Sequence, residues 1–316
     1  MSSRFHSGFI GAIGFASLGA ILFAAKAIVV KYSYHYGASA DVVLTLRMVF
    51  ALPIFWLAVW VYGQQKSPAP LVLRDALQVA AIGLLGYFLS SYLDFLGLQY
   101  VTVGLERVIL YLTPAIVLVL SKLFLKKPID PRQYWAMAVA YLGIVMVFVH
   151  DLRINDSGAV FLGSGLVFLA ALVYSVYLIF AGELVGRVGS IRLVAIASTS
   201  ATIATCVQSL FLGVDQLFTQ SPEVYYLAMI NALFCTFMPM LFIMMAVNRI
   251  GSSMTAQAGT AGPVGTAFLG WYFLDETISA LQLLGITVVL VGIAILVSIG
   301  NQPNQNKSDL SATPSE

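Results

Sequence analysis

Long apolar stretches, separated by short polar breaks, follow one another along almost the whole chain. Each stretch is close to the roughly 20 apolar residues that a helix needs to cross a bilayer. The breaks hold turn-forming residues, as in Ser67-Pro68-Ala69-Pro70 and Asn155-Asp156-Ser157-Gly158. The pattern predicts an all-α integral membrane protein of about ten transmembrane helices, near residues 9–30, 42–62, 76–98, 101–124, 133–150, 160–182, 191–213, 224–248, 252–274 and 279–299.

The composition points to lipid as the solvent. Hydrophobic residues make up 60% of the 316 positions and charged residues only 9%, and the mean hydropathy is +0.92. Soluble domains carry about 25% charged residues, so this chain cannot cover a water-facing surface with polar side chains. The net charge of +2 gives no sign of a nucleic-acid partner. The tail at 301–316 is rich in Asn, Ser, Gln and Pro, and we expect it to be disordered and cytoplasmic.

Basic residues are distributed unequally between the two sides on which the predicted loops fall. Loops that face the cytoplasm are enriched in Lys and Arg. The side that carries both termini receives most of them, namely Arg4, Lys66, Arg74, Lys122, Lys126, Lys127, Arg132, Arg187, Arg192, Arg249 and Lys307. We therefore expect a multi-pass protein of the cell membrane (inner or plasma membrane) with both termini in the cytoplasm.

The chain also carries an internal duplication. A shift of 149 positions superposes Leu98–Val147 on Val247–Leu296 without a gap, and it matches Pro114 with Pro263 in mid-span. The predicted repeats are residues 9–150 and 160–299, with five helices each. Because five is odd, the second repeat must insert upside down, and repeats of this kind are a recurring design of secondary transporters. The exchange of Lys126-Lys127 for Asp275-Glu276 between equivalent loops agrees with this inversion.

The second half contains a motif that resembles a known family. The stretch Ala258–Glu276 is followed by Leu281-Gln-Leu-Leu-Gly285 and Gly292, and the first half repeats the outline from Thr113-Pro114 to Gly143. This pattern resembles the EamA domain, the repeat unit of the drug/metabolite transporter (DMT) superfamily. The resemblance implies ten helices in two inverted halves, a central cavity and alternating access.

Ionisable residues inside the predicted spans gather in the first half of the chain. They are Lys26, Arg47, Asp94, Glu106 and Arg107, all placed in the outer third of the membrane by the predicted helix directions. Such residues are costly in a bilayer and mark functional sites by default. The alternative is a structural ion-pair network, or side chains that extend to the interface from helix ends. We predict a substrate-binding or coupling site here.

Further polar and helix-breaking residues extend the predicted site. Tyr87, Ser91 and Asp94 share one face of the third span at helical spacing, and Tyr111 lies one turn after Arg107. Asn231 and Gln257 add uncharged polar groups to the predicted site. Helix breaks beside a cavity are predicted at Pro114, Gly259, Gly262 and Pro263. The small residues favour either close helix packing or backbone that lines a cavity.

These features favour a secondary transporter of a small metabolite, amino-acid-like or otherwise polar, working by export or exchange. A proton or a counter-substrate is the expected coupling partner, and a monomer or homodimer the expected assembly. The alternatives are a non-transporting scaffold or sensor, a channel and, least favoured, an intramembrane enzyme. No nucleotide, metal or hydrolase motif is present, so we expect no catalytic residue and no cofactor or metal. Cys206 and Cys235 are interpreted as small buried hydrophobes.

Overall fold

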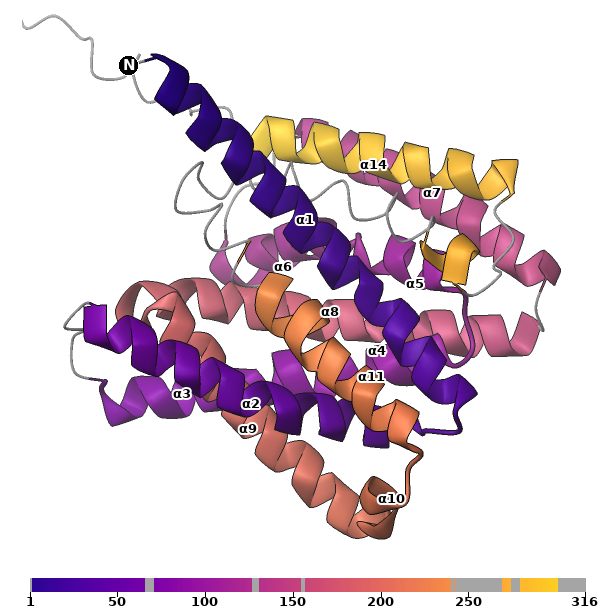
Figure 1. Ribbon diagram of the computed structural model, residues 1–316. Coiled ribbons are helices and arrows are strands. Elements are labelled where there is room, and N and C mark those ends of the chain that lie inside the picture. The colour runs from indigo at the N-terminus through magenta and orange to yellow at the C-terminus, as the bar shows by residue number, and fades with distance from the viewer. Residues whose placement is uncertain are drawn as a thin grey trace, which may run out of the picture.

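The computed structural model describes residues 2–65, 71–126, 131–154, 157–239, 242, 269–273 and 279–300, and all regular structure in these ranges is helical. The elements are α1 (Ser2–His35), α2 (Ala40–Gln65), α3 (Leu73–Gly83), η1 (Leu84–Leu89), α4 (Ser90–Leu98), α5 (Val103–Leu110), α6 (Thr113–Leu125), α7 (Pro131–Ile154), α8 (Ser157–Val188), α9 (Ser190–Leu212), α10 (Asp215–Phe218), α11 (Pro222–Ala232), η2 (Leu233–Phe237) and α14 (Ala280–Gly300). Figure 1 shows them packed side by side as a helical bundle.

Five of these helical segments are long and apolar enough to cross a membrane. They are Ala40–Val61, Leu73–Leu98, Val103–Phe124, Ser157–Val188 and Ile191–Leu212, and two shorter apolar helices cover Tyr134–His150 and Ala280–Gly292. The protein is thus all-helical and suited to a membrane in the part described. The predicted count of ten spans is not established, because most of the ninth span and the end of the eighth lie outside the described residues, as does the tail at 301–316.

The spans are less regular than the sequence pattern predicts. The third span contains a π-helical segment, η1, and the eighth contains another, η2. The fourth span is divided by a turn at Tyr111 and Leu112, and Pro114 lies in the first turn of α6 directly after it. A short helix, α10, occupies the predicted loop before the eighth span. An extra residue in a turn of helix leaves the hydropathy of an apolar stretch unchanged, so the pattern could not reveal the π segments.

Tight turns hold the first two helices of each half together. Gly37, between α1 and α2, has φ +84°, and Gly189, between α8 and α9, has φ +82°. These left-handed conformations suit glycine because it lacks a Cβ atom. Each turn brings two consecutive long helices back alongside one another.

Three helical elements of the second half begin 149 residues after their counterparts in the first half. Leu73, Leu84 and Pro131 begin α3, η1 and α7, and the positions 149 residues later, Pro222, Leu233 and Ala280, begin α11, η2 and α14. The π-helical segments therefore occupy matched places in the two halves. This displacement equals the shift found in the sequence.

Matched helices that touch run in opposite directions. From α2, the Thr45 hydroxyl contacts the Ser209 hydroxyl at 3.2 Å, and Trp56 Nε1 donates to Thr199 Oγ1 at 3.0 Å. Rising numbers on α2 thus meet falling numbers on its counterpart α9. Opposite directions of equivalent helices are what two inverted repeats require.

The contact between α7 and α14, at the top of Figure 1, also joins equivalent positions of the two halves. A Cβ atom on Gly143 would lie 2.5 Å from the carbonyl oxygen of Gly285, and one on Gly292 would lie 2.8 Å from that of Ala136. Gly292 and Gly285 lie 149 positions after Gly143 and Ala136, so the two contacts are equivalent. The backbones touch because both glycines lack side chains.

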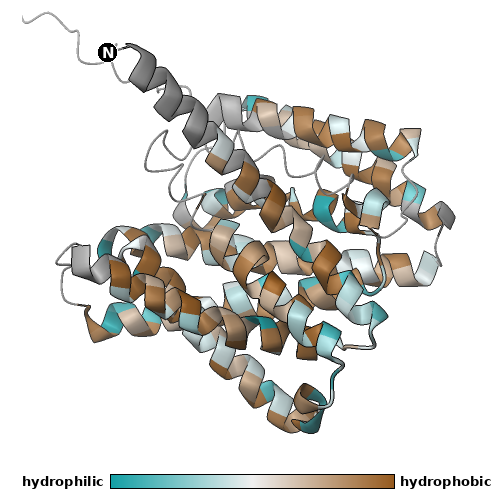
Figure 2. Ribbon diagram, viewed as in Figure 1, coloured by the Kyte–Doolittle hydropathy of each residue, from teal (hydrophilic) through white to brown (hydrophobic). Residues whose placement is uncertain are grey.

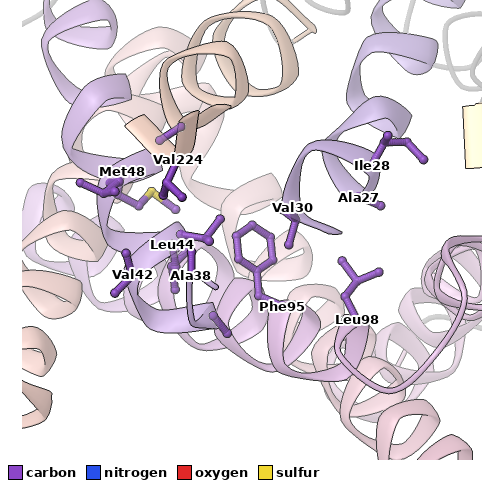
Figure 3. Close-up of a cluster of buried hydrophobic side chains, with 14 of the residues drawn as sticks. Ala27, Ile28, Val30, Ala38, Val42, Leu44, Met48, Phe95, Leu98 and Val224 are labelled. Atoms are coloured by element: carbon purple, nitrogen blue, oxygen red, sulfur yellow. The ribbon is translucent and has the colours of Figure 1, made fainter. Parts of the chain in front are cut away.

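The apolar core is divided among several clusters of buried side chains. In one of them, shown in Figure 3, the ring of Phe95 points between Val30 of α1 and Leu44 of α2, and Val224 of α11 packs nearby. Large apolar side chains also cover the outside, such as Trp60, Trp135 and Phe211, and brown residues predominate along the helices in Figure 2. An apolar exterior over a core that contains charges suits a protein surrounded by lipid.

Candidate functional site

The five ionisable residues predicted to lie within the first-half spans are all buried. Their exposed fractions are 6% for Lys26, 5% for Arg47, 3% for Asp94, 0% for Glu106 and 4% for Arg107. They come from α1, α2, α4 and α5, and so from four helices that are separate in sequence. None of them extends to solvent from a helix end, which removes that explanation for their presence.

Two ion pairs are formed within this group. Lys26 Nζ donates to Asp94 Oδ2 at 2.6 Å and joins α1 to α4. Arg107 Nε lies 3.0 Å from Glu106 Oε2, although the angles leave neither atom with a hydrogen bond there. Arg107 also donates from Nη2 to the carbonyl oxygen of Phe23 at 3.2 Å. The site therefore contains three bases and two acids, and the two acids form ion pairs with only two of the bases.

Two phenylalanine rings each lie close to two of the three cations. Arg47 Cζ is 4.9 Å from the centroid of the Phe95 ring, and Lys26 Nζ is 5.5 Å from it. Lys26 Nζ is 5.6 Å from the centroid of the Phe23 ring, and Arg107 Cζ is 5.8 Å from it. A cation over an aromatic face gains about 0.5–2 kcal/mol, so the rings offset part of the repulsion between like charges. We call Lys26, Arg47, Asp94, Glu106, Arg107, Phe23 and Phe95 the charged cluster.

The two acids of the charged cluster also face each other. Asp94 and Glu106 lie within electrostatic reach of each other, and Lys26 and Arg107 lie within reach of both. Among the described residues, Asp94 Oδ1 and the two oxygens of Glu106 have no hydrogen-bond partner. These oxygens can accept a hydrogen bond from a ligand, or a proton.

Comparison with known proteins decides the family of the chain. The model of the EamA-like transporter family matches twice, over residues 10–149 and 161–298. The chain belongs to the EamA-like transporter family. It is accordingly a multi-pass membrane transporter of the drug/metabolite transporter type, as the resemblance of its motifs implied.

Individual relatives of this EamA-family chain agree with the family match. The uncharacterized transporter YcbK of Bacillus subtilis is 30% identical over 280 residues, which cover 86% of this chain and 88% of YcbK. The uncharacterized transporter YyaM of the same organism is 20% identical over 76% of this chain and 79% of its own. One solved crystal structure is 14% identical in sequence to this chain. The superposition covers 93% of this chain and 100% of the other chain, and its TM-score of 0.62 supports the fold.

The remaining predicted site residues of this EamA-family chain lie at different distances from the charged cluster. Ser91 joins it directly, because its Oγ accepts a hydrogen bond from Arg47 Nη2 at 3.1 Å. Tyr111 lies within electrostatic reach of Arg107 and Glu106. Tyr87 lies within reach of Arg47, but its ring packs edge-on against Tyr177 of α8 at 5.4 Å. Tyr87 thus connects the charged cluster to the second half.

Asn231 is fully buried in α11, and neither its Nδ2 nor its Oδ1 has a hydrogen-bond partner in the described part of the chain. One turn later, Cys235 in η2 is also buried and lies within electrostatic reach of Lys26, Arg47 and Arg107. Cys235 therefore brings the second half within electrostatic reach of the cluster, and Asn231 lies one turn before it. Gln257, Gly259, Gly262 and Pro263, which the sequence also predicted for the site, lie outside the described residues.

Sequence reasoning missed three members of the site in this EamA-family chain. Phe23 and Phe95 look like ordinary membrane-helix residues, although Phe23 lies one turn before Lys26 and Phe95 directly follows Asp94. Both cysteines were interpreted as small buried hydrophobes. Cys206 is exposed, whereas Cys235 is buried but lies within electrostatic reach of charged groups. Its spacing of four residues from Asn231 was the available signal.

Proposed function

We propose that this protein is a secondary transporter that carries a small polar, amino-acid-like solute across the cell membrane by alternating access. The charged cluster, together with Tyr87, Ser91, Tyr111 and Asn231, serves as the binding and coupling site. Export or exchange is the proposed mode, with a proton or a counter-substrate as the coupling partner. The termini face the cytoplasm in this proposal, in accordance with the distribution of basic residues.

The proposal rests on buried polar groups that lack hydrogen-bond partners among the described residues. A purely structural network would satisfy its own atoms, since each unsatisfied buried polar group costs about 1–3 kcal/mol. Here, donors on Arg47 and Asn231 and acceptors on Asp94, Glu106 and Asn231 have no hydrogen-bond partners among the described residues. A solute with both positive and negative groups would supply the missing partners, which is why an amino-acid-like molecule fits.

Inverted repeats provide the means of alternating access. The common displacement of helix starts and the opposite directions of α2 and α9 support two repeats, residues 9–150 and 160–299, related by a two-fold axis in the membrane plane. Two halves of this kind exchange conformations, so that a site between them opens first to one side and then to the other. The charged cluster lies on the first repeat, and Asn231 and Cys235 contribute from the second.

Flux measurements on purified protein in proteoliposomes test this function. Labelled amino acids, small organic acids, polyamines and nucleosides are offered one at a time, and protein-free vesicles provide the background. We expect at least one solute to enter with saturable kinetics, and faster when the vesicles are preloaded with the same unlabelled solute. Non-saturating flux would indicate a channel, and no flux of any solute would indicate a scaffold or sensor; either result would overturn the proposal.

Glu106→Gln tests the role of the two facing acids in proton coupling. Two carboxylates held close together in a buried site favour sharing one proton. In this proposal that proton couples transport, so we expect an imposed pH gradient to accelerate transport by the wild type several-fold. In the variant this acceleration disappears, and the rates with and without the gradient become equal. Glu183→Gln, an exposed position on α8, is the matched control and should respond like the wild type. A full response of Glu106→Gln would exclude this pair as the coupling site.

A further inference from the structure

Among the described residues, Arg47 is a buried cation that forms no ion pair with a carboxylate, although Asp94 lies within electrostatic reach. In the described part of the chain, Asp94 pairs with Lys26 and Glu106 pairs with Arg107, and no acid pairs with Arg47. Its guanidinium makes one hydrogen bond, from Nη2 to Ser91 Oγ, and lies over the Phe95 ring. Its Nε has no hydrogen-bond partner. Among the described residues, the Nε donor is therefore left unused.

Burial makes this arrangement unfavourable in the absence of a ligand. Arginine stays protonated in proteins, and an unpaired buried charge carries a desolvation cost of several kcal/mol. One hydroxyl and one aromatic ring return only part of that cost. The three bases and two acids of the charged cluster leave one positive charge in excess, and that excess falls at Arg47.

The surroundings of Arg47 in the second half of the chain are polar but uncharged. Cys235 lies within electrostatic reach of Arg47, and the amide of Asn231, one turn earlier on α11, is buried with Nδ2 and Oδ1 both unpartnered. In the first half, Tyr87 also lies within electrostatic reach of Arg47. An unpartnered donor amide one turn from Cys235 and a guanidinium without an ion pair together suit an anionic oxygen ligand.

We infer that Arg47 binds a carboxylate group of the transported solute, and that Asn231 and Cys235 form the facing wall of this subsite. The inference rests on the proposed transport function and names the substrate class as carboxylate-bearing. A carboxylate fits better than a phosphate because it brings one negative charge, equal to the excess in the cluster. Its two oxygens also match the planar guanidinium fork, which binds carboxylates through paired hydrogen bonds.

Thermal-shift and equilibrium-binding measurements on the purified protein test the carboxylate requirement. The probes are the standard amino acids, simple monocarboxylates such as acetate and lactate, and the matching amides, which lack the charge. We expect at least one carboxylate probe to bind and its amide to bind at least about tenfold more weakly, a loss of 1.4 kcal/mol. Amides that bind as well as the acids, or no binding by any carboxylate probe, would overturn the inference.

Substitutions at Arg47 locate the subsite. Arg47→Lys keeps the charge but loses the fork, and Arg47→Gln loses both. We expect the first to weaken carboxylate binding about tenfold and the second to abolish it, while the response to the amide is unchanged. Arg187→Gln, at an arginine whose side chain is 58% exposed, is the matched control and should bind like the wild type. If Arg47→Gln fails to fold, Arg47→Lys still decides, because unchanged affinity in that variant contradicts the assignment.

Alkylation of Cys235 tests whether the second repeat borders the same subsite. Cys206 is the other cysteine of the chain, so Cys206→Ser leaves Cys235 as the single thiol. A carboxylate probe should slow its reaction with N-ethylmaleimide, and the amide should not. Equal rates with and without the carboxylate probe would remove Cys235 from the subsite. Carboxylate binding without flux would refute the transport function alone, whereas flux that does not depend on a carboxylate would refute this inference alone.

Discussion

Asp94→Asn is expected to destabilise the protein by about 3–5 kcal/mol, the usual cost of removing one partner of a buried ion pair. The pair of Lys26 and Asp94 is 2.6 Å long, and both side chains are almost fully buried. Without Asp94, the three bases of the charged cluster would face Glu106 as the single acid. Unfolding in detergent, followed by intrinsic fluorescence during heating, measures the loss as a large drop in the melting temperature.

The double variant Lys26→Met/Asp94→Asn separates stability from transport. It removes one positive and one negative charge together, so the remaining cluster keeps the excess charge of the wild type. Replacing a buried pair by uncharged groups is often close to neutral. We therefore expect most of the lost stability to return in the double variant, while transport is abolished because two members of the proposed binding site are gone. Asp75→Asn is the control, because Asp75 pairs at 3.1 Å with Arg187, which is largely exposed, and such pairs contribute about 0–1 kcal/mol. Equal stability of Asp94→Asn and the wild type would show that the pair is not formed.

Gly143→Val and Gly292→Val are expected to destabilise the α7–α14 pair strongly and by similar amounts. The first Cβ atom would lie 2.5 Å from the carbonyl oxygen of Gly285, and the second 2.6 Å from the backbone nitrogen of Ala140. Backbone atoms cannot rotate away, so the helices must separate, and overpacking of this kind costs about 1–3 kcal/mol. The melting temperature in detergent measures the effect in each variant.

A substitution elsewhere on the bundle controls for the loss of glycine itself. Gly165 lies in α8, and a Cβ atom there would meet nothing within 4 Å. Gly165→Val should therefore have little effect on the melting temperature. A large effect at Gly143 with none at Gly292 would contradict the equivalence of the two contacts under the shift of 149 positions.

The sequence predicted well what depends on hydropathy and charge. Apolar stretches predicted helices throughout the described ranges, and the cost of charge in a bilayer predicted that Lys26, Arg47, Asp94, Glu106 and Arg107 would be special. The structure brings all five together. Their burial follows from the rule that charged side chains in such helices avoid lipid.

What the sequence could not provide depends on contacts between distant helices. Which base pairs with which acid is set by the packing of α1 on α4, so the Lys26–Asp94 pair could be imagined but not assigned. Phe95 and Cys235 acquire their roles from neighbours on other helices, and no local pattern distinguishes them from packing residues. The π-helical segments depend on a single extra residue in a turn, which leaves hydropathy unchanged.

The matched π-helical segments, η1 and η2, carry information about the history of the protein. They occupy equivalent places in the two halves, whereas the ionisable residues of the charged cluster occur in the first half alone. A feature shared by both copies of a duplicated gene dates from before the duplication, and a feature of one copy arose or was kept after it. On the two repeats proposed above, the π-helical segment of the third helix therefore dates from a single ancestral unit. The charged residues of the first half mark where the two halves have diverged, so that ligand binding depends mainly on one repeat in this proposal.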